Sequence, residues 1–153
     1  YPDLRWARRD IKSTNLLAQV MAKEAANQSG AFEALMVDTN GIITEAGSSS
    51  FFFIKDNALY VRPVSQEILH GITRQTMLRV AKDHGISLIE RTYRLDEALA
   101  ADEALITASS IYVLPVGKID GKPIGDGNAG AFTLALREGY LAKARLEFYS
   151  TEV

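Results

Sequence analysis

The feature that most constrains the fold is a series of short apolar runs, bounded by turn residues and interrupted by segments of helical period. Short apolar runs between turn residues predict β-strands, and the first three such runs indicate an antiparallel meander. The runs cover residues 31–38, 51–55, 58–63, 86–93 and 103–109. Residues 113–124 predict a hairpin that turns at Asp120 and Gly121, because an Asp-Gly pair suits a two-residue turn.

Apolar residues at helical spacing predict helices between these strands. Ser13 or Thr14 is expected to cap the first helix, and Gly30 and Gly85 are expected just past the ends of the first two. Strands and helices do not alternate in a strict βαβ order, so the pattern predicts an α+β fold with a curled sheet and helices outside. The predicted helices cover residues 13–30, 71–85, 95–101 and 131–149.

Length and composition bound the function. The chain has 153 residues and no repeat or linker, which predicts a single domain over residues 1–153. The 17 basic and 19 acidic residues form no block of like charge, so no nucleic-acid partner is expected. There is no cysteine, and His70 and His84 are isolated, so no metal site is expected. No apolar run approaches membrane-spanning length, and residues 1–10 lack a signal-peptide core, which predicts a cytoplasmic protein without membrane association.

The segment GDGNAG, residues 125–130, matches the G-x-G-x-x-G pattern and precedes a predicted helix. A dinucleotide site also needs a second strand after that helix, with an acidic residue for the ribose. The chain ends with the helix, so we interpret this segment as a glycine-rich loop that leads into a helix N-terminus.

Four stretches, far apart in the sequence, carry residue types that suit one chemistry. They offer an amine that could form a Schiff base, a carboxylate followed by small residues, a helix N-terminus with a threonine, and a pair of hydroxyls after a buried strand. Helix N-termini and hydroxyls bind phosphate, because free N–H groups and the helix dipole favour an anion. Pyridoxal phosphate needs this combination of groups. The stretches are DIKSTN (residues 10–15), TEAGSSSFFF (44–53), LHGITR (69–74) and TASS (107–110).

The order and spacing of these stretches resemble the C-terminal, larger domain of a class IV (fold type IV) pyridoxal-phosphate aminotransferase, most of all the D-amino-acid (D-alanine) transaminases. The resemblance runs from Arg5 to the last helix. It rests on RW and DIKS, a glutamate thirty-three residues after the lysine, then GIT, T-x-S-S and the pair Pro115 and Val116. It implies a D-amino-acid-aminotransferase-like fold, in which a curled mixed sheet forms a pseudo-barrel with helices outside.

By this resemblance, Lys12 is the lysine that forms the internal aldimine with the cofactor. It would also move a proton between the substrate Cα and the cofactor C4′, and burial and a nearby cation are expected to favour the neutral amine that this step needs. Glu45 matches the glutamate at the pyridine nitrogen. A carboxylate there keeps the nitrogen protonated, so that the ring can accept electrons.

Other matches concern the phosphate and the face of the ring. Gly71, Ile72 and Thr73 match a phosphate-binding turn. Gly71 would permit close approach, while the N–H groups of Ile72 and Thr73 and the Thr73 hydroxyl would donate. Leu69 resembles the leucine that packs against one face of the pyridine.

Three serines and an arginine complete the matches. Ser48 resembles a cofactor-side serine of the family. Ser109, with Ser110, matches a second phosphate loop where the family often has threonine, and serine keeps the hydroxyl. Arg5 matches an arginine close to the cofactor in the D-alanine transaminases.

The sequence departs from the family pattern in three ways. The asparagine usual five residues after the glutamate is Ser50, which can alter how that loop is braced. Branched-chain relatives carry a tyrosine where this chain has Leu17, and this favours the D-amino-acid type. Family members also have a preceding domain of ~100 residues, which supplies a phosphate-binding arginine, a tyrosine over the cofactor and residues that grip the substrate carboxylate. This chain is therefore expected to be a fragment with half a site and negligible turnover alone.

The resemblance implies amino-group transfer from a D-amino acid to a 2-oxo acid by a ping-pong cycle, in a homodimer. Branched-chain aminotransferases, R-selective amine transaminases and aminodeoxychorismate lyases would use the same Lys12 and Glu45. A non-catalytic binding or assembly domain that keeps the fold is the alternative from another class of function. The presence of Lys12, Glu45 and Thr73 argues against that alternative.

Overall fold

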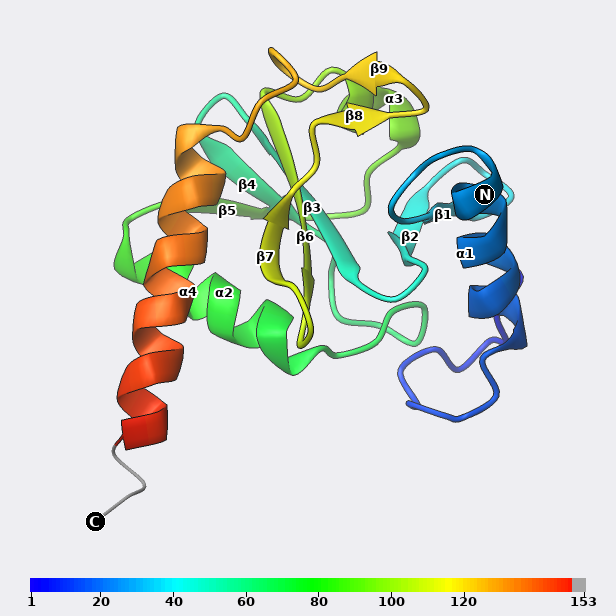
Figure 1. The fold of residues 1–153 in the computed structure, drawn as a ribbon, viewed down its shortest axis with the longest axis horizontal. Coiled ribbons are helices and arrows are strands. Elements are labelled where there is room, and N and C mark those ends of the chain that lie inside the picture. Colours follow the sequence, from blue (N-terminus) through cyan, green and yellow to red (C-terminus); the bar gives the residue numbers. More distant parts are fainter. Residues whose placement is uncertain (150–153) are drawn as a thin grey trace.

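A five-stranded mixed sheet forms the centre of the computed structural model, which describes residues 1–149 and the side chains of residues 1–146 (Figure 1). Neighbouring strands run antiparallel except for β4 and β5, which are parallel. The strands lie in the order β5 (Ser87–Glu90), β4 (Ala58–Val61), β3 (Ser50–Lys55), β6 (Glu103–Ala108) and β7 (Tyr112–Pro115).

Both faces of this sheet are buried, which explains why its central strand is a continuous apolar run. Phe52 and Ile54 of β3 pack on one face under helices α2 (Ile72–Asp83) and α4 (Ala131–Tyr149). Phe51 and Phe53 point to the other face. There they contact Tyr93, in a cluster that includes helix α3 (Leu95–Leu99).

A separate two-stranded sheet lies beside the main one and carries helix α1 (Leu17–Gln28) (Figure 1). Strand β1 (Leu35–Val37) pairs antiparallel with β2 (Ile43–Ala46), and the alanines on one side of α1 pack against Met36. The sequence analysis did not predict β2. The prediction of a simple meander is wrong beyond β3 and β4, because β6 pairs with the free edge of β3 and β1 pairs with β2.

The predicted hairpin is present, but it is shorter than expected. Strands β8 (Lys118–Ile119) and β9 (Lys122–Pro123) pair across a turn in which Asp120 has φ 50° and Gly121 has φ 75°. Two successive left-handed residues are what a tight two-residue hairpin requires. Residues 113–115 belong instead to β7, at the edge of the main sheet.

The helix boundaries confirm the glycine predictions and correct the N-cap prediction. Gly30 and Gly85 follow α1 and α2 with φ of 71° and 69°, as expected for residues that end a helix. The N-cap of α1 is Leu16, without a side-chain cap, and not Ser13 or Thr14. The helix begins late because the chain before it runs irregularly along the edge of a cleft.

The GDGNAG segment leads into α4, and a protein carboxylate already occupies that helix N-terminus. The N–H groups of Phe132 and Thr133 donate to the two oxygens of Glu103 at 3.1 and 2.8 Å. A Cβ on Gly130 would lie 2.0 Å from the Glu103 carboxyl carbon, so glycine is needed for this close approach. This contact supports the interpretation of a structural loop.

The prediction of an α+β fold with a mixed sheet and outer helices is confirmed, and the sheet stays open in residues 1–149. In the same part of the chain, no helix combines the length and the apolar character that crossing a membrane would require.

Candidate active site

A cleft of about 660 Å³ lies between α1, the start of α2 and the ends of β2 and β6. Of the nine residues predicted for the site, Ser110 is absent from the residues that line the cleft. The other eight line it: Lys12, Glu45, Ser48, Leu69, Gly71, Ile72, Thr73 and Ser109.

The pairing of strands explains why stretches so distant in sequence converge. Ser50, at the start of β3, is paired with Thr107, near the end of β6, so the TEAGSSS and TASS stretches lie side by side. Gly71 caps α2 next to them, and a Cβ on Gly71 would lie 3.5 Å from the Ser50 hydroxyl oxygen. Gly71 has φ −61° and ψ 132°, which any residue adopts. A methyl group at 3.5 Å would make only ordinary van der Waals contact, so the described residues would admit a side chain at position 71, and the close approach of a ligand there remains a prediction.

The start of α2 and its neighbours form a place for an anion. No side chain caps this helix, and Thr73 in its first turn is 4% exposed. The hydroxyl oxygens of Ser49 and Thr107 are buried and have no hydrogen-bond partner among the residues that the structure describes. Buried hydroxyls normally find a partner, so an acceptor from outside the chain suits this end of the cleft.

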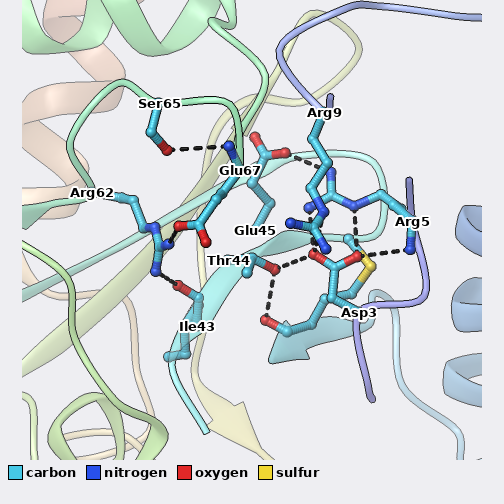
Figure 2. A network of polar contacts seen from close by, with 10 residues as sticks. Asp3, Arg5, Arg9, Ile43, Thr44, Glu45, Arg62, Ser65 and Glu67 are labelled. Atoms are coloured by element: carbon cyan, nitrogen blue, oxygen red, sulfur yellow. Dashed lines mark hydrogen bonds and ion pairs between the residues drawn. The ribbon is translucent and has the colours of Figure 1, made fainter. Parts of the chain in front are cut away.

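Glu45, which also lines the cleft, belongs to a chain of alternating charges (Figure 2). Arg5 Nη1 donates to Glu45 Oε2 at 2.6 Å, and its Nε and Nη2 donate to the Asp3 carboxylate at 3.0 and 2.8 Å. Asp3 also accepts from the Thr44 hydroxyl at 2.6 Å, and Arg9 Nε lies 3.2 Å from it. The contact of Arg5 with Glu45 agrees with the expected closeness of Arg5 to the site.

The two carboxylates of this network have opposite pKa shifts. Burial raises the pKa of Glu45, although Arg5 opposes the rise and the backbone N–H of Leu69 lowers the pKa as well. Burial would also raise the pKa of Asp3, but hydrogen bonds from Arg5 and Thr44 outweigh it and lower the pKa. Arg5 and the Leu69 N–H therefore favour the ionised form of Glu45.

Lys12 lies on the irregular segment before α1 and is exposed. The backbone N–H of Arg9 donates to the Gln66 carbonyl at 2.9 Å, and this bond ties the lysine-bearing segment to the loop that leads into α2. The expectation that Lys12 is buried is wrong for this structure, in which its side chain is exposed.

These stretches also identify the family. The amino-transferase class IV family model matches residues 2–119. The chain belongs to the class IV aminotransferases. Curated relatives include the D-alanine aminotransferases of Staphylococcus aureus (strain N315) and Bacillus licheniformis. They are 43% and 44% identical over 90% and 86% of this chain, and over 49% and 46% of their own lengths. The chain thus spans about half the length of these relatives.

Solved structures of the same family share the fold. A branched-chain amino acid aminotransferase solved with pyridoxamine 5'-phosphate superposes with a TM-score of 0.84 at 35% sequence identity, over 92% of this chain and 47% of that protein. The branched-chain aminotransferase of the archaeon Thermoproteus uzoniensis, solved with norvaline, superposes with a TM-score of 0.82 at 30% identity. That match covers 92% of this chain and 49% of the archaeal protein.

The three serines predicted for the site of this class IV aminotransferase chain differ in their surroundings. Ser48 is exposed, donates to Glu33 Oε2 at 2.6 Å and accepts from Lys23 Nζ at 3.3 Å. Its hydroxyl thus already has protein partners. Ser109 and Ser110 are both exposed, but only Ser109 borders the cleft.

Part of this site was not predicted. Asp3 and Thr44 were not selected, nor were Ser49 and Thr107, whose buried hydroxyls have no partner among the described residues. A cluster of charges just before the lysine was the available signal for Asp3. Thr107 opens the T-x-S-S motif, but its place at the cleft follows from its pairing with Ser50.

Proposed function

We propose that this chain is the cofactor-binding half of a pyridoxal-phosphate aminotransferase that exchanges amino groups between a D-amino acid and a 2-oxo acid. The observation that carries the proposal is the convergence of eight predicted residues on one cleft. Its lining includes a buried carboxylate and a helix N-terminus without a side-chain cap. The residues present therefore fit a molecule that is cationic at one end and anionic at the other.

The proposed roles of the residues follow from this arrangement. Bound pyridoxal phosphate would supply an aldehyde that takes up the amino group and a ring that withdraws electrons. The Lys12 amine would hold the aldehyde carbon and later carry the proton at the substrate Cα. Glu45, with Arg5 beside it, would keep a proton on the ring nitrogen. Leu69 would pack on the ring face.

The phosphate would lie at the start of α2. The N–H groups of Ile72 and Thr73, the Thr73 hydroxyl and the hydroxyl of Ser109 are the proposed donors, with Gly71 leaving room beside them. The unpartnered hydroxyls of Ser49 and Thr107 lie in the same region of the described chain. Ser48 and Ser110 are weaker candidates: Ser48 bonds to Glu33, and Ser110 is outside the cleft lining.

The D-amino-acid class is supported by the curated relatives, which are D-alanine aminotransferases at 43% and 44% identity. A branched-chain aminotransferase is the second candidate, supported by the structural match to a branched-chain enzyme at 35% identity. The homodimer and the cytoplasmic location remain predictions.

A labelling experiment tests the cofactor role. The chain is incubated with pyridoxal phosphate, reduced with borohydride and digested, and the modified peptide is mapped by mass spectrometry. We expect one pyridoxyl group, on Lys12. Lys23→Ala is the matched control, because Lys23 also lines the cleft and should not be needed for labelling. Scattered labelling that is equal in Lys12→Ala would overturn the proposal for this chain.

The substrate class is tested with the complete protein that carries this chain. Amino transfer to 2-oxoglutarate is measured with D-alanine and with L-leucine as donors. Faster transfer from D-alanine supports the first candidate, and faster transfer from L-leucine supports the second. A labelled Lys12 without transfer from any amino acid would favour a non-catalytic binding domain.

A further inference from the structure

Two buried arginines lie close to the cleft wall that carries Glu45, and of the two only Arg74 also lines the cleft. Arg62 directly follows β4, Arg74 lies in the first turn of α2, and each is 4% exposed. Burying a guanidinium is costly unless its donors are used, and an apolar residue of similar size often stabilises a fold as well. In the described part of the chain, Arg74 forms no ion pair, and burial lowers its pKa. Positions like these call for a specific contact that an apolar side chain would not make.

The contacts of Arg62 join two elements of the cleft wall (Figure 2). Its Nη1 donates to the Ile43 carbonyl of β2 at 2.7 Å, two residues before Glu45, and its Nη2 forms an ion pair with Glu67. Arg74 Nη2 donates to the Arg62 carbonyl at 2.7 Å. The beginning of segment 62–71 is therefore fixed both to β2 and to α2, and the ion pair with Glu67 joins this beginning to the middle of the segment.

Segment 62–71 carries two features of the proposed site. The backbone N–H of Leu69 donates a hydrogen bond to the Glu45 carboxylate. Gly71 is the N-cap of the helix whose N-terminus would bind the phosphate. A shift of this segment would therefore move the Leu69 N–H and the start of α2 together. The distance between them matters, since one rigid ring with its phosphate would have to span it.

We propose that Arg62 is a positioning residue, which holds segment 62–71 on β2 so that Leu69 and the start of α2 stay in register with Glu45. The proposal rests on the proposed cofactor role of the cleft. Arg62 does not line the cleft and would touch neither cofactor nor substrate. It acts through the backbone of Leu69 on Glu45, and through Gly71 on the phosphate end.

A pH-dependent readout follows from this role. Loss of the Leu69 N–H would remove a group that lowers the pKa of Glu45, so the pKa would rise further. Activity that needs ionised Glu45 is lost as pH falls through that pKa, so the acid limb of the pH profile would move to higher pH. The other titratable or charged groups around Glu45 and the cleft are Asp3, Arg5, Arg9, Lys12, Lys23, His70, Arg74 and Tyr93.

The experiment uses the complete holoenzyme and two variants. Arg62→Met keeps the length of the side chain but removes every donor. We expect the affinity for pyridoxal phosphate to fall roughly tenfold and the acid limb of kcat/KM to move up by about one pH unit. Arg62→Lys keeps a charged donor but lacks the planar fork that reaches the Ile43 carbonyl and Glu67 from two different nitrogens, so a smaller shift in the same direction is expected.

Two controls separate the alternatives. Arg79→Met changes an exposed arginine of α2 and should leave both the affinity for pyridoxal phosphate and the acid limb of kcat/KM unchanged. Borohydride labelling of Lys12 in the wild type shows whether the cofactor role holds at all, and its absence would overturn the proposed function rather than the role of Arg62. If Lys12 of the wild type is labelled, and a folded Arg62→Met enzyme has the wild-type affinity for pyridoxal phosphate and the wild-type acid limb of kcat/KM, the positioning role is wrong. If Arg62→Met does not fold, the same criterion applies to Arg62→Lys.

Discussion

The two walls of the cleft differ in how far their side chains are buried and held by contacts within this chain. The inner wall, formed by β2, segment 62–71 and the start of α2, is dense with buried polar groups. Glu45 is 5% exposed there, and arginines hold the backbone in place. The outer wall, formed by residues 6–16 and α1, is exposed. Leu17 on that wall is 68% exposed, and Lys12 is open to solvent.

This difference separates two parts of the proposed chemistry. Recognition of the ring nitrogen and the phosphate belongs to the inner wall, which is already ordered in the described residues. The amine that would do the covalent work belongs to the outer wall, where few contacts orient it. Since the inner wall would bind the cofactor and the outer wall would carry the reactive amine, we expect substitutions in the inner wall to change cofactor affinity and substitutions in the outer wall to change turnover.

Lys12→Ala is expected to have the largest effect. Removal of the only group proposed to bind the aldehyde and carry the proton should lower turnover in the complete protein by at least about 10⁴-fold. Non-covalent affinity for pyridoxal phosphate should change little, because the inner wall is intact. Turnover is measured as oxo-acid formation and affinity by cofactor fluorescence. A variant that loses affinity as strongly as turnover would show that the two walls do not act separately.

Asp3→Asn is expected to cause the next largest change, in stability. The Asp3 side chain is 0% exposed and pairs with Arg5, so its loss leaves a buried guanidinium partly uncompensated, at about 3–5 kcal/mol of unfolding free energy near neutral pH. The pKa of Asp3 is lowered in the folded chain. Its stabilisation is therefore present above the unfolded pKa, about 3.9, and is lost as pH falls through the folded value.

Urea unfolding at neutral pH and at about pH 3 measures this difference. The gap between Asp3→Asn and wild type should narrow at the lower pH. Asp10→Asn is the matched control, because Asp10 pairs with Arg8 at the surface and its loss should change stability much less. Equal effects of the two variants would contradict the view that the buried network of Asp3, Arg5 and Thr44 supports Glu45 on the inner wall.

The parts of the fold that were predicted correctly depend on neighbours in sequence. The ends of α1 and α2 at Gly30 and Gly85, and the turn at Asp120 and Gly121, follow from local backbone preferences. Strand β2 was missed because it is short and contains Glu45. It exists through its pairing with β1, which no local pattern encodes.

The candidate site shows the same division. Residues that match a family motif were found, and they line the cleft together. Arg62 was not found, since arginine is seldom buried and its burial depends on the carbonyl of Ile43, nineteen residues away. Lys12 was expected to be buried, but a residue type and its spacing do not say which side of a loop remains open.

Thr73→Val tests the phosphate end of the inner wall. The substitution keeps the shape of the side chain and removes one hydroxyl donor to an anion. A hydrogen bond to a charged group contributes roughly 1.5–3 kcal/mol, so the dissociation constant for pyridoxal phosphate should rise at least about tenfold. Thr76→Val, one turn later on the same helix, is the control and should leave the affinity unchanged. Equal losses in both variants would point to a general weakening of α2.

Leu17→Gln should have the smallest effect and tests the outer wall. Leu17 and Val20 lie on the exposed side of α1, so a polar residue there replaces few contacts in this chain. The unfolding free energy of the 153-residue chain should change by less than about 0.5 kcal/mol. The same substitution at Leu136, which is 0% exposed on α4, should cost about 3 kcal/mol or more. Comparable losses at the two leucines, measured by urea unfolding, would mean that the outer wall is packed in solution. The contrast between an ordered recognition wall and an open reactive wall would then have to be abandoned.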